Sequence, residues 1–285
     1  MQNSHSQKII LITGTSSGFG LLIAARLSAK GHIVYATMRD INKSENLRQE
    51  IAKRGGYIQI RALDVTKLES IKEVVDEIKK THNRLDCVIN NAGYGLGGFF
   101  EDLTQEQLRD IMDVNFFGVQ NVCREVIPVM RVQKSGLIIN MSSIAGLTAA
   151  PAFGAYNASK WALEAFSESL FHELSLFGIK VVIVEPGSYP TKIFSENAQY
   201  AKNFDNPQSP YCKVSQTLHR WVQEGKSRMT RNPEHVACLI EKIVHTKNPR
   251  LRYISDFRSW LEVKARQFMP KRTYGIILRR ILHGN

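Results

Sequence analysis

Residues 8–20, KIILITGTSSGFG, contain the strongest fold signal in the chain. The apolar run up to Thr13 predicts a buried strand, because strands covered on both faces carry continuous apolar residues. Gly14, Gly18 and Gly20 follow it, and the helical pattern LLIAARLSAKG begins directly afterwards. Glycines in such a turn permit positive φ and let a pyrophosphate approach a helix N-terminus. The context predicts a nucleotide site, and a plain strand-to-helix turn is the alternative.

The same alternation of strand and helix continues downstream. Further strand patterns lie at residues 32–37, 57–63, 85–92, 136–143 and 179–187. Helical patterns lie between them, centred near residues 45–54, 67–81, 105–133 and 157–176. Strands that alternate with helices predict an α/β fold, a doubly wound parallel sheet of Rossmann type with helices on both faces.

Composition and charge narrow the class of protein. The chain has 285 residues, of which 43% are hydrophobic and 22% charged, which is typical of a globular domain. Its net charge of +12 is uneven, because residues 247–285 hold ten Lys or Arg and two Asp or Glu. Charge gathered in one tail argues against a nucleic-acid groove. No signal-peptide core or membrane-spanning run occurs, so a cytoplasmic protein is expected. The four scattered cysteines indicate no metal site.

Tyr156 and Lys160 are four residues apart at the start of a predicted helix. At this spacing both side chains lie on one helix face, so the ammonium is expected to lower the pKa of the phenol. Such a phenol exchanges a proton with a carbonyl or an alcohol. Ser143 ends a predicted strand, where strand ends of an open α/β sheet converge on the ligand crevice. Taken alone, the Tyr and Lys pair is also compatible with a surface coincidence.

The combined pattern resembles the short-chain dehydrogenase/reductase family over roughly residues 8–191. The motifs that carry the resemblance are Gly14/Gly18/Gly20, Asn90-Asn91-Ala92-Gly93, Asn115, Ser143, Tyr156 and Lys160. The resemblance implies that Tyr156 is the general acid or base and that Lys160 lowers its pKa and holds the nicotinamide ribose. It further implies that Ser143 bonds the substrate oxygen and that Asn115 positions a water in the proton relay.

The resemblance also implies a set of cofactor-binding residues. Asp64 is expected to contact the adenine, and Pro186-Gly187 with Thr191 to bind the carboxamide. The full set is Gly14, Ser16, Gly18, Phe19, Gly20, Arg39, Asp64, Val65, Asn91, Ala92, Gly93, Tyr156, Lys160, Pro186, Gly187 and Thr191.

The end of the second predicted strand, VYATMRD, indicates the choice of cofactor. Met38 stands where the resemblance places the acid of NAD-binding members, and Arg39 follows. A guanidinium binds a 2′-phosphate bidentately and Ser16 adds a hydroxyl, so NADP is predicted. In the alternative, Asp40 holds the ribose and NAD is used; capping the next helix is a sufficient role for that Asp.

The sequence pattern divides one domain into four parts. Residues 1–187 are the expected dinucleotide-binding and catalytic core, and residues 188–231 a cover over the substrate with a short helix. Residues 232–256 are expected to form the last helix and strand, and residues 257–285 a basic amphipathic extension. The resemblance further implies a homodimer or homotetramer through the helices near 105–133 and 157–176.

Apolar residues near the expected site predict a lipophilic ketone, aldehyde or alcohol as the substrate. The resemblance implies that it is steroid-, retinoid- or fatty-chain-like. The candidates, several of which are expected to be core, are Tyr94, Leu96, Phe99, Phe100, Leu147, Phe153, Tyr189, Ile193, Phe194, Leu218 and Trp221. The stretches TGTSSGFG, VYATMRD and SSIAGL are most similar to the hydroxysteroid and retinol dehydrogenase-like branch. A non-catalytic NADP-binding sensor on the same fold is the alternative function.

The C-terminal tail has an amphipathic pattern. Its apolar stripe is Tyr274, Ile277, Leu278, Ile281 and Leu282, flanked by basic residues, and Phe257, Trp260, Leu261 and Phe268 suggest a helix before it. Two interpretations remain for the stripe. It packs against the body, the pocket or another subunit, as surface helices normally do, or it lies on an anionic membrane surface.

Overall fold

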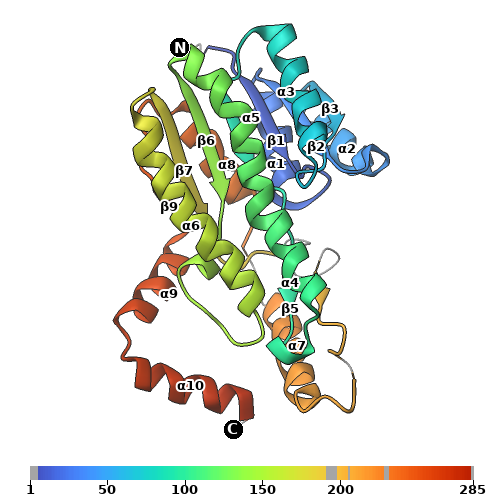
Figure 1. Cartoon of the computed structure of the whole chain (residues 1–285), viewed down its shortest axis with the longest axis vertical. Coiled ribbons are helices and arrows are strands. Elements are labelled where there is room, and N and C mark those ends of the chain that lie inside the picture. Colours follow the sequence, from blue (N-terminus) through green and yellow to red (C-terminus); the bar gives the residue numbers. More distant parts are fainter. Residues whose placement is uncertain (1–5, 191–197, 205, 228–230, 284–285) are drawn as a thin grey trace.

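The computed structural model describes residues 6–190, 198–204, 206–227 and 231–283. Within them, seven strands form one parallel sheet in the order β3-β2-β1-β4-β6-β7-β9 (Figure 1). This arrangement confirms the predicted doubly wound α/β fold. The strands are β1 (Ile9–Thr13), β2 (Ile33–Met38), β3 (Ile58–Ala62), β4 (Cys87–Asn90), β6 (Gly136–Met141), β7 (Ile179–Glu185) and β9 (Arg252–Ile254).

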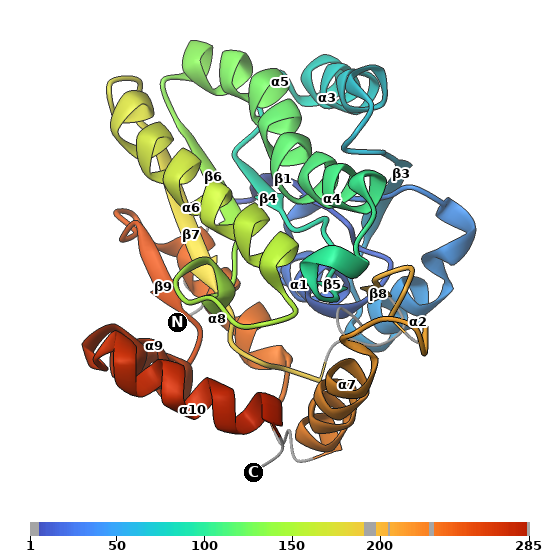
Figure 2. The same cartoon turned by 60° about the horizontal axis from the view of Figure 1, so that its bottom comes forward.

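Helices cover both faces of the sheet, as Figure 2 shows for α5 and α6 against α1 and α8. One layer contains α1 (Gly18–Ala29), α2 (Glu45–Arg54) and α8 (Glu234–His245), and the other α3 (Leu68–His82), α5 (Gly118–Gln133) and α6 (Gly154–Ser175). In β1, Ile10 and Ile12 join the core under the first layer, whereas Ile9 and Leu11 join the core under the second. Both faces are buried, which is why the strand has no polar positions.

The predicted helix at 105–133 contains a π turn. It begins as α4 (Gln105–Met112), widens through Asp113–Phe117 and continues as α5. Thr104 and Gln107 form a capping box at its start. A π turn inserts a residue into an α-helix and often occurs at functional sites. Here it contains Asn115.

The order of the strands reverses between β1 and β4. The chain proceeds from β1 through β2 to β3 on one side, and from β4 through β6 and β7 to β9 on the other. Ligands of open α/β sheets bind outside the carboxyl ends of the strands at this point. The loops that follow β1 and β4 therefore define the site.

The remaining elements gather beyond the carboxyl ends of the strands. β5 (Leu96–Gly97) pairs with β8 (Gln199–Tyr200), and α7 (Cys212–Ser227), α9 (Phe257–Phe268) and α10 (Lys271–His283) lie at the lower end of the molecule (Figures 1 and 2). Among the tail's contacts with the body, the Tyr274 hydroxyl donates to the Ala149 carbonyl over 3.2 Å. None of the described helices is long and apolar enough to cross a membrane.

Candidate active site

The glycine turn after β1 fits closely against the loop after β4. Gly14 and Gly18 have φ of 71° and 59°, which side-chain-bearing residues rarely adopt. A Cβ at Gly14 would lie 2.7 Å from Ala92 Cα, and one at Gly20 would collide with the Gly14 carbonyl and the Asn91 side chain. The close contact between the two loops thus requires glycine at positions 14 and 20.

Hydrogen bonds fix the same two loops together. Asn91 Nδ2 donates to the carbonyls of Thr13 (3.0 Å) and Gly14 (2.8 Å). The backbone N–H groups of Asn91 and Ala92 both donate to Thr13 Oγ1 over 3.0 Å. Asn91 therefore stabilises the floor of the glycine turn.

A large, open cleft lies above this turn. The glycine turn at its base would let the pyrophosphate of an extended dinucleotide approach the backbone. Ten of the predicted cofactor residues line it: Gly14, Ser16, Gly18, Phe19, Arg39, Asp64, Val65, Asn91, Ala92 and Gly93. Lys43 and Val114 also line it and were not predicted, and so does Tyr94, which was predicted to line the substrate site. The sequence signal that could have identified Lys43 is its position as a second basic residue shortly after Arg39.

The far wall of the cleft is basic. Arg39 and Lys43 are exposed there. Asp40 Oδ1 accepts the Asn42 N–H over 3.0 Å and so caps the 3₁₀ turn Ile41–Ser44. On the next loop, Asp64 Oδ1 accepts from the backbone N–H (3.0 Å) and the hydroxyl (2.7 Å) of Thr66. Both carboxylates thus stabilise local turns.

Tyr156, Lys160 and Ser143 lie together at the carboxyl end of β6. Tyr156 and Lys160 are 3% and 5% exposed, respectively, and the Lys160 Nζ is 5.9 Å from the Tyr156 ring centroid. That Nζ donates to the Met141 carbonyl over 2.9 Å. Ser143 follows β6 and caps the 3₁₀ turn Ile144–Gly146 by accepting the Ala145 N–H. The i, i+4 spacing in α6 thus places phenol and ammonium on one buried face.

Burial controls the protonation of this group. It raises the pKa of Tyr156 to about 12, against the lowering effect of a hydrogen bond with Ser143. It lowers the pKa of Lys160 to about 8, against the raising effect of Glu164. The predicted lowering of the phenol pKa by Lys160 is therefore absent from this structure, because desolvation dominates. At neutral pH the phenol is protonated.

Asn115 connects the π turn to the loop after β4. Its Oδ1 accepts the Tyr94 N–H (3.1 Å), and its Nδ2 donates to the Tyr94 carbonyl (3.0 Å) and to Ser159 Oγ (3.2 Å). A Cβ at Gly93 would lie 3.0 Å from Asn115 Oδ1 and 3.9 Å from Lys160 Nζ. The fold thus brings Asn115 and Lys160 together beside Gly93.

The segment after β7 closes the site from the other side. The Pro186 carbonyl accepts the Ile144 N–H over 3.1 Å, which ties it to the Ser143 turn. A Cβ at Gly187 would collide with Ser259 of α9. Thr191 and the lining candidates Ile193 and Phe194 lie outside the described residues.

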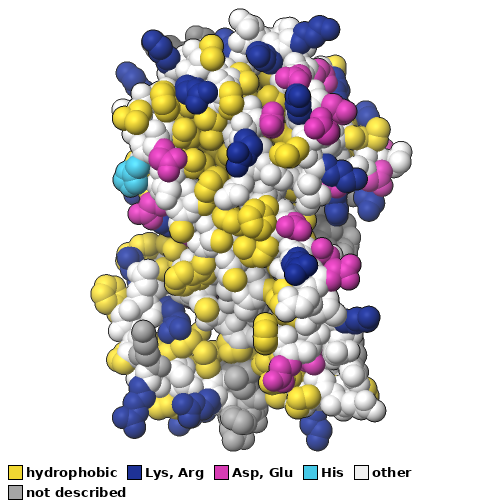
Figure 3. Space-filling model, viewed as in Figure 1, with side chains coloured by type: hydrophobic (Ala, Val, Ile, Leu, Met, Phe, Trp, Pro, Cys, Tyr) yellow, Lys and Arg dark blue, Asp and Glu magenta, His cyan; other side chains and the backbone are white. Residues whose placement is uncertain are grey.

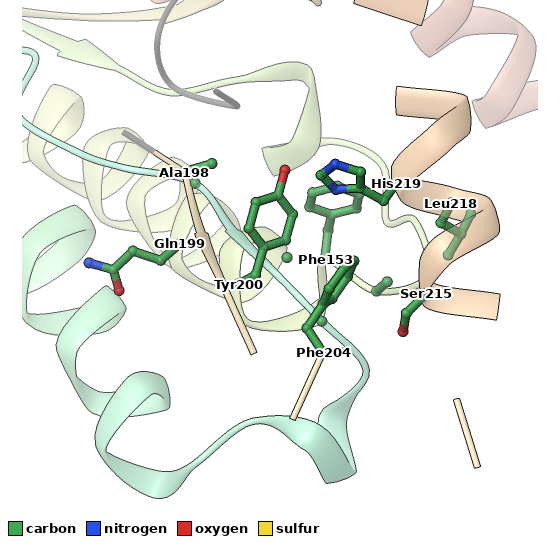
Figure 4. Close-up of a pocket in the computed structure, with 12 residues that line it drawn as sticks. Phe153, Ala198, Gln199, Tyr200, Phe204, Ser215, Leu218 and His219 are labelled. Carbon is green, nitrogen blue, oxygen red and sulfur yellow. The ribbon is translucent and has the colours of Figure 1, made fainter. Parts of the chain in front are cut away.

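A second, much smaller pocket lies beside the first turn of α6 (Figure 4). Phe153, three residues before Tyr156, contributes to it, as does Leu218 of α7. Tyr200, Phe204 and His219 form an aromatic group in its wall, with ring centroids 4.9 to 5.7 Å apart. These three were not predicted, because no periodic pattern marks them.

Several predicted lining residues lie elsewhere. Leu96 and Tyr189 are buried in the core. Phe99 stacks on Tyr211 at 4.6 Å, and Phe100 is 73% exposed. Tyr94 lines the large cleft. Apolar character alone did not distinguish lining from core residues.

An ionic cluster that no sequence motif predicted lies one turn behind Lys160. Arg252 of β9 pairs with Glu164 and Glu168 of α6 and with Glu185 of β7, which is 3.3 Å away. The Glu164 and Glu185 side chains are only 7% and 1% exposed. The i, i+4 series Tyr156, Lys160, Glu164 and Glu168 was the one local signal for it.

Comparison with known proteins agrees with this site. A family model described as short chain dehydrogenase matches residues 8–201. The chain is 37% identical over 278 residues to a 3-ketodihydrosphingosine reductase from Bacteroides thetaiotaomicron, covering 94% of this chain and 98% of that protein. It is 32% identical over 262 residues to human retinol dehydrogenase 8, covering 88% and 82% respectively.

A solved structure shows the same fold. The crystal structure of a short-chain dehydrogenase from Streptomyces avermitilis superposes with a TM-score of 0.80 at 31% identity, covering 98% of this chain and 99% of that one. The resemblance drawn from the motifs is confirmed by these matches. The chain, which carries the glycine cleft and the buried tyrosine and lysine described above, belongs to the short-chain dehydrogenase family, and it is an oxidoreductase of that family.

Proposed function

We propose that this protein is an NADP(H)-dependent oxidoreductase that interconverts a carbonyl and an alcohol on a lipophilic substrate. One observation carries the proposal: Ser143, Tyr156, Lys160 and Asn115 come together from a strand end, α6 and a π turn, beside the glycine cleft. The bound nicotinamide would supply or accept the hydride. A non-catalytic sensor would not require this complete set.

The roles follow from the protonation states. A phenol with a pKa of about 12 is protonated at neutral pH and is ready to donate to a carbonyl oxygen, which favours reduction. Ser143, hydrogen-bonded to Tyr156, orients the same oxygen and stabilises its developing charge. The Lys160 ammonium, close to Gly93, would hold the ribose and stabilise the phenolate that forms.

The basic wall of the cleft supports NADP over NAD. Arg39 and Lys43 supply two cations, and the Asp40 carboxylate already caps a turn. A 2′-phosphate would be held by charge-assisted hydrogen bonds. A metagenomic short-chain oxidoreductase solved in complex with NADP is 25% identical to this chain, with a TM-score of 0.69 over 87% of this chain and 96% of that one.

The aromatic pocket supports a lipophilic substrate. Its walls are the rings of Phe153, Tyr200 and Phe204 with Leu218 (Figure 4). Two relatives are named for substrates with long apolar chains, 3-ketodihydrosphingosine and retinol. We propose a fatty-chain-like or retinoid-like carbonyl, covered by residues 188–231.

A panel of carbonyl compounds tests the function. NADPH consumption is expected with long-chain ketones and aldehydes and not with small sugars. Tyr156→Phe should lower kcat/KM by about 10²- to 10⁴-fold, because the proton donor is lost. Tyr57→Phe, at a tyrosine that is 74% exposed, is the control. Equal turnover by Tyr156→Phe would remove the proposed role of the phenol.

We also propose a cytoplasmic homodimer or homotetramer that pairs through the region of α5 and α6. Phe117 and Trp161 support this, because they are 45% and 51% exposed although they are large and apolar. Sedimentation velocity of Trp161→Glu should show a smaller species than the unaltered protein; an unchanged species would exclude this pairing.

A further inference from the structure

Helix α9 turns its largest apolar side chains away from the protein. Phe257 and Phe268 are 75% and 82% exposed, and Trp260 and Leu261 are 43% and 52% exposed. The inward positions are Ser259 and Val263, which are buried. A surface helix normally has the opposite arrangement, with its apolar stripe toward the core.

The orientation of α9 is fixed at its N-terminus. The Asp256 carboxylate caps the helix by accepting the Ser259 N–H over 2.9 Å. Arg231 donates to Ser259 Oγ (2.9 Å) and pairs with Asp256 (3.3 Å). Ser259 in turn packs against Gly187. Because the inward side is held by these contacts, rotating α9 to bury its aromatic side chains would break them.

Helix α10 extends the apolar surface and adds charge. Ile276 and Ile277 are 46% and 40% exposed. Tyr274, one turn before Ile277, bonds Ala149 and stacks with Arg266. The basic side chains Arg258, Arg272, Arg279 and Arg280 are exposed around these residues. Figure 3 shows hydrophobic and basic side chains side by side over α9 and α10, at the lower left.

We propose that this surface docks on an anionic lipid membrane. The outward face consists of Phe257, Trp260, Leu261, Phe268, Ile276 and Ile277. It includes Ile277 of the stripe singled out in the sequence. Aromatic and aliphatic side chains enter the boundary between headgroups and acyl chains, while neighbouring Lys and Arg side chains bind anionic headgroups.

The positive charge of the C-terminal segment favours a membrane, rather than a second copy of the chain, as the partner of this surface. Residues 247–285 hold ten basic and two acidic residues, a net charge of +8. Two such segments face to face would repel, whereas an anionic lipid surface attracts each of them. Helix α10 also lies beside α7, part of the proposed substrate cover, so docking would place that cover near the bilayer.

Vesicle sedimentation tests the proposal with the full chain and without substrate or cofactor. The protein is expected to sediment with vesicles of 70% phosphatidylcholine and 30% phosphatidylserine (about these proportions) and to be released by high salt. The variant Phe257→Ser/Trp260→Ser/Phe268→Ser should lower the binding constant at least about tenfold. Arg279→Gln/Arg280→Gln should lower it about 25-fold, because each basic residue near the surface contributes roughly fivefold.

Tyr57→Ser is the matched control, because Tyr57 is 74% exposed, close to the 75% of Phe257, and belongs to the loop before β3. It should bind vesicles like the unaltered protein. The proposal is overturned if no vesicle binds the protein, if both variants bind as well as the control, or if the aromatic variant changes the oligomeric state instead. None of these results depends on turnover, so the proposed reaction is tested separately.

Discussion

Lys160 is a basic residue whose buried surroundings disfavour its charged form. Burial lowers the pKa of its ammonium to about 8, and the nearby Glu164 carboxylate acts in the opposite direction. The ammonium is present below that pH and is lost above it. Because it is needed to stabilise the tyrosinate that forms during reduction, activity and protonation of Lys160 are coupled.

The pH–rate profile should show this coupling. For a carbonyl substrate that does not ionise, kcat/KM of reduction is expected to fall as the pH rises through about 8. Lys160→Arg, which keeps its charge to higher pH, should remove this fall in kcat/KM at high pH even if its overall rate is lower. A profile of the unaltered enzyme that stays flat to pH 10 would contradict the assignment.

Arg39 should decide between the two cofactors. Arg39→Ala is expected to raise KM for NADPH about tenfold or more and to leave KM for NADH within about twofold, because a charge-assisted hydrogen bond to the 2′-phosphate contributes about 1.5–3 kcal/mol. Steady-state kinetics with both cofactors measures this. Asp40→Asn is the companion variant, and a selective loss of NADH activity there would favour the NAD alternative.

At the scale of elements, the π turn between α4 and α5 determines where Asn115 points. The amide forms three hydrogen bonds, two of them to the backbone of Tyr94 at the end of the loop after β4. In an uninterrupted α-helix, without the inserted residue, the side chains on one side of the turn would point in directions rotated by roughly 100°, the turn of the helix per residue. The wider turn thus has a structural function as well as a place in the site.

Asn115→Ala is expected to lower the free energy of unfolding by about 2 kcal/mol, since it leaves a partly buried N–H and a partly buried carbonyl of Tyr94 without their partners. Urea unfolding followed by circular dichroism measures the change. Asn121→Ala is the control on the same helical path: it removes a single bond, to the Val65 carbonyl, and should cost about 1 kcal/mol. Equal losses for the two variants would argue against a bridging role.

At the scale of the whole molecule, Arg252 joins three elements that are distant in sequence. It pairs with α6, which carries Tyr156 and Lys160, and with the end of β7, which leads into Pro186 and Gly187. Burial, and then the nearby Glu164, raises the pKa of Glu185 from 4.5 to about 7. Arg252 is thus the shared partner of the buried carboxylates of Glu164 and Glu185. The free energy of unfolding therefore depends on whether Glu185 is protonated.

The direction in which the free energy of unfolding changes with pH can be measured. Between pH 4.5 and about 7 the folded chain holds a proton on Glu185 that the unfolded chain has lost, so the free energy of unfolding falls as the pH rises through this window. Glu185→Gln should flatten this slope and, above pH 7, raise stability by up to about 3 kcal/mol. Thermal unfolding from pH 5 to 8 tests it. Glu168→Gln, at a side chain that is 52% exposed, should leave the slope unchanged.

Much of this protein could be predicted from its sequence, because the signals are local. Strand β1 is recognisable because both of its faces are buried, and the glycine turn because its φ values exclude other residues. The spacing of Tyr156 and Lys160 follows from the helix repeat alone. These features depend on a few neighbouring residues and the geometry of the backbone.

Other features were decided only when distant segments packed together. Glu164 and Arg252 are 88 residues apart in the chain, and no local pattern links them. Burial set the pKa of Tyr156 higher than its spacing from Lys160 predicted, because desolvation depends on every surrounding element. The aromatic face of α9 points outward because Arg231 and Gly187 hold its small side chains inward. Helix periodicity defines such a face, and tertiary contacts determine whether it meets the core or the surroundings.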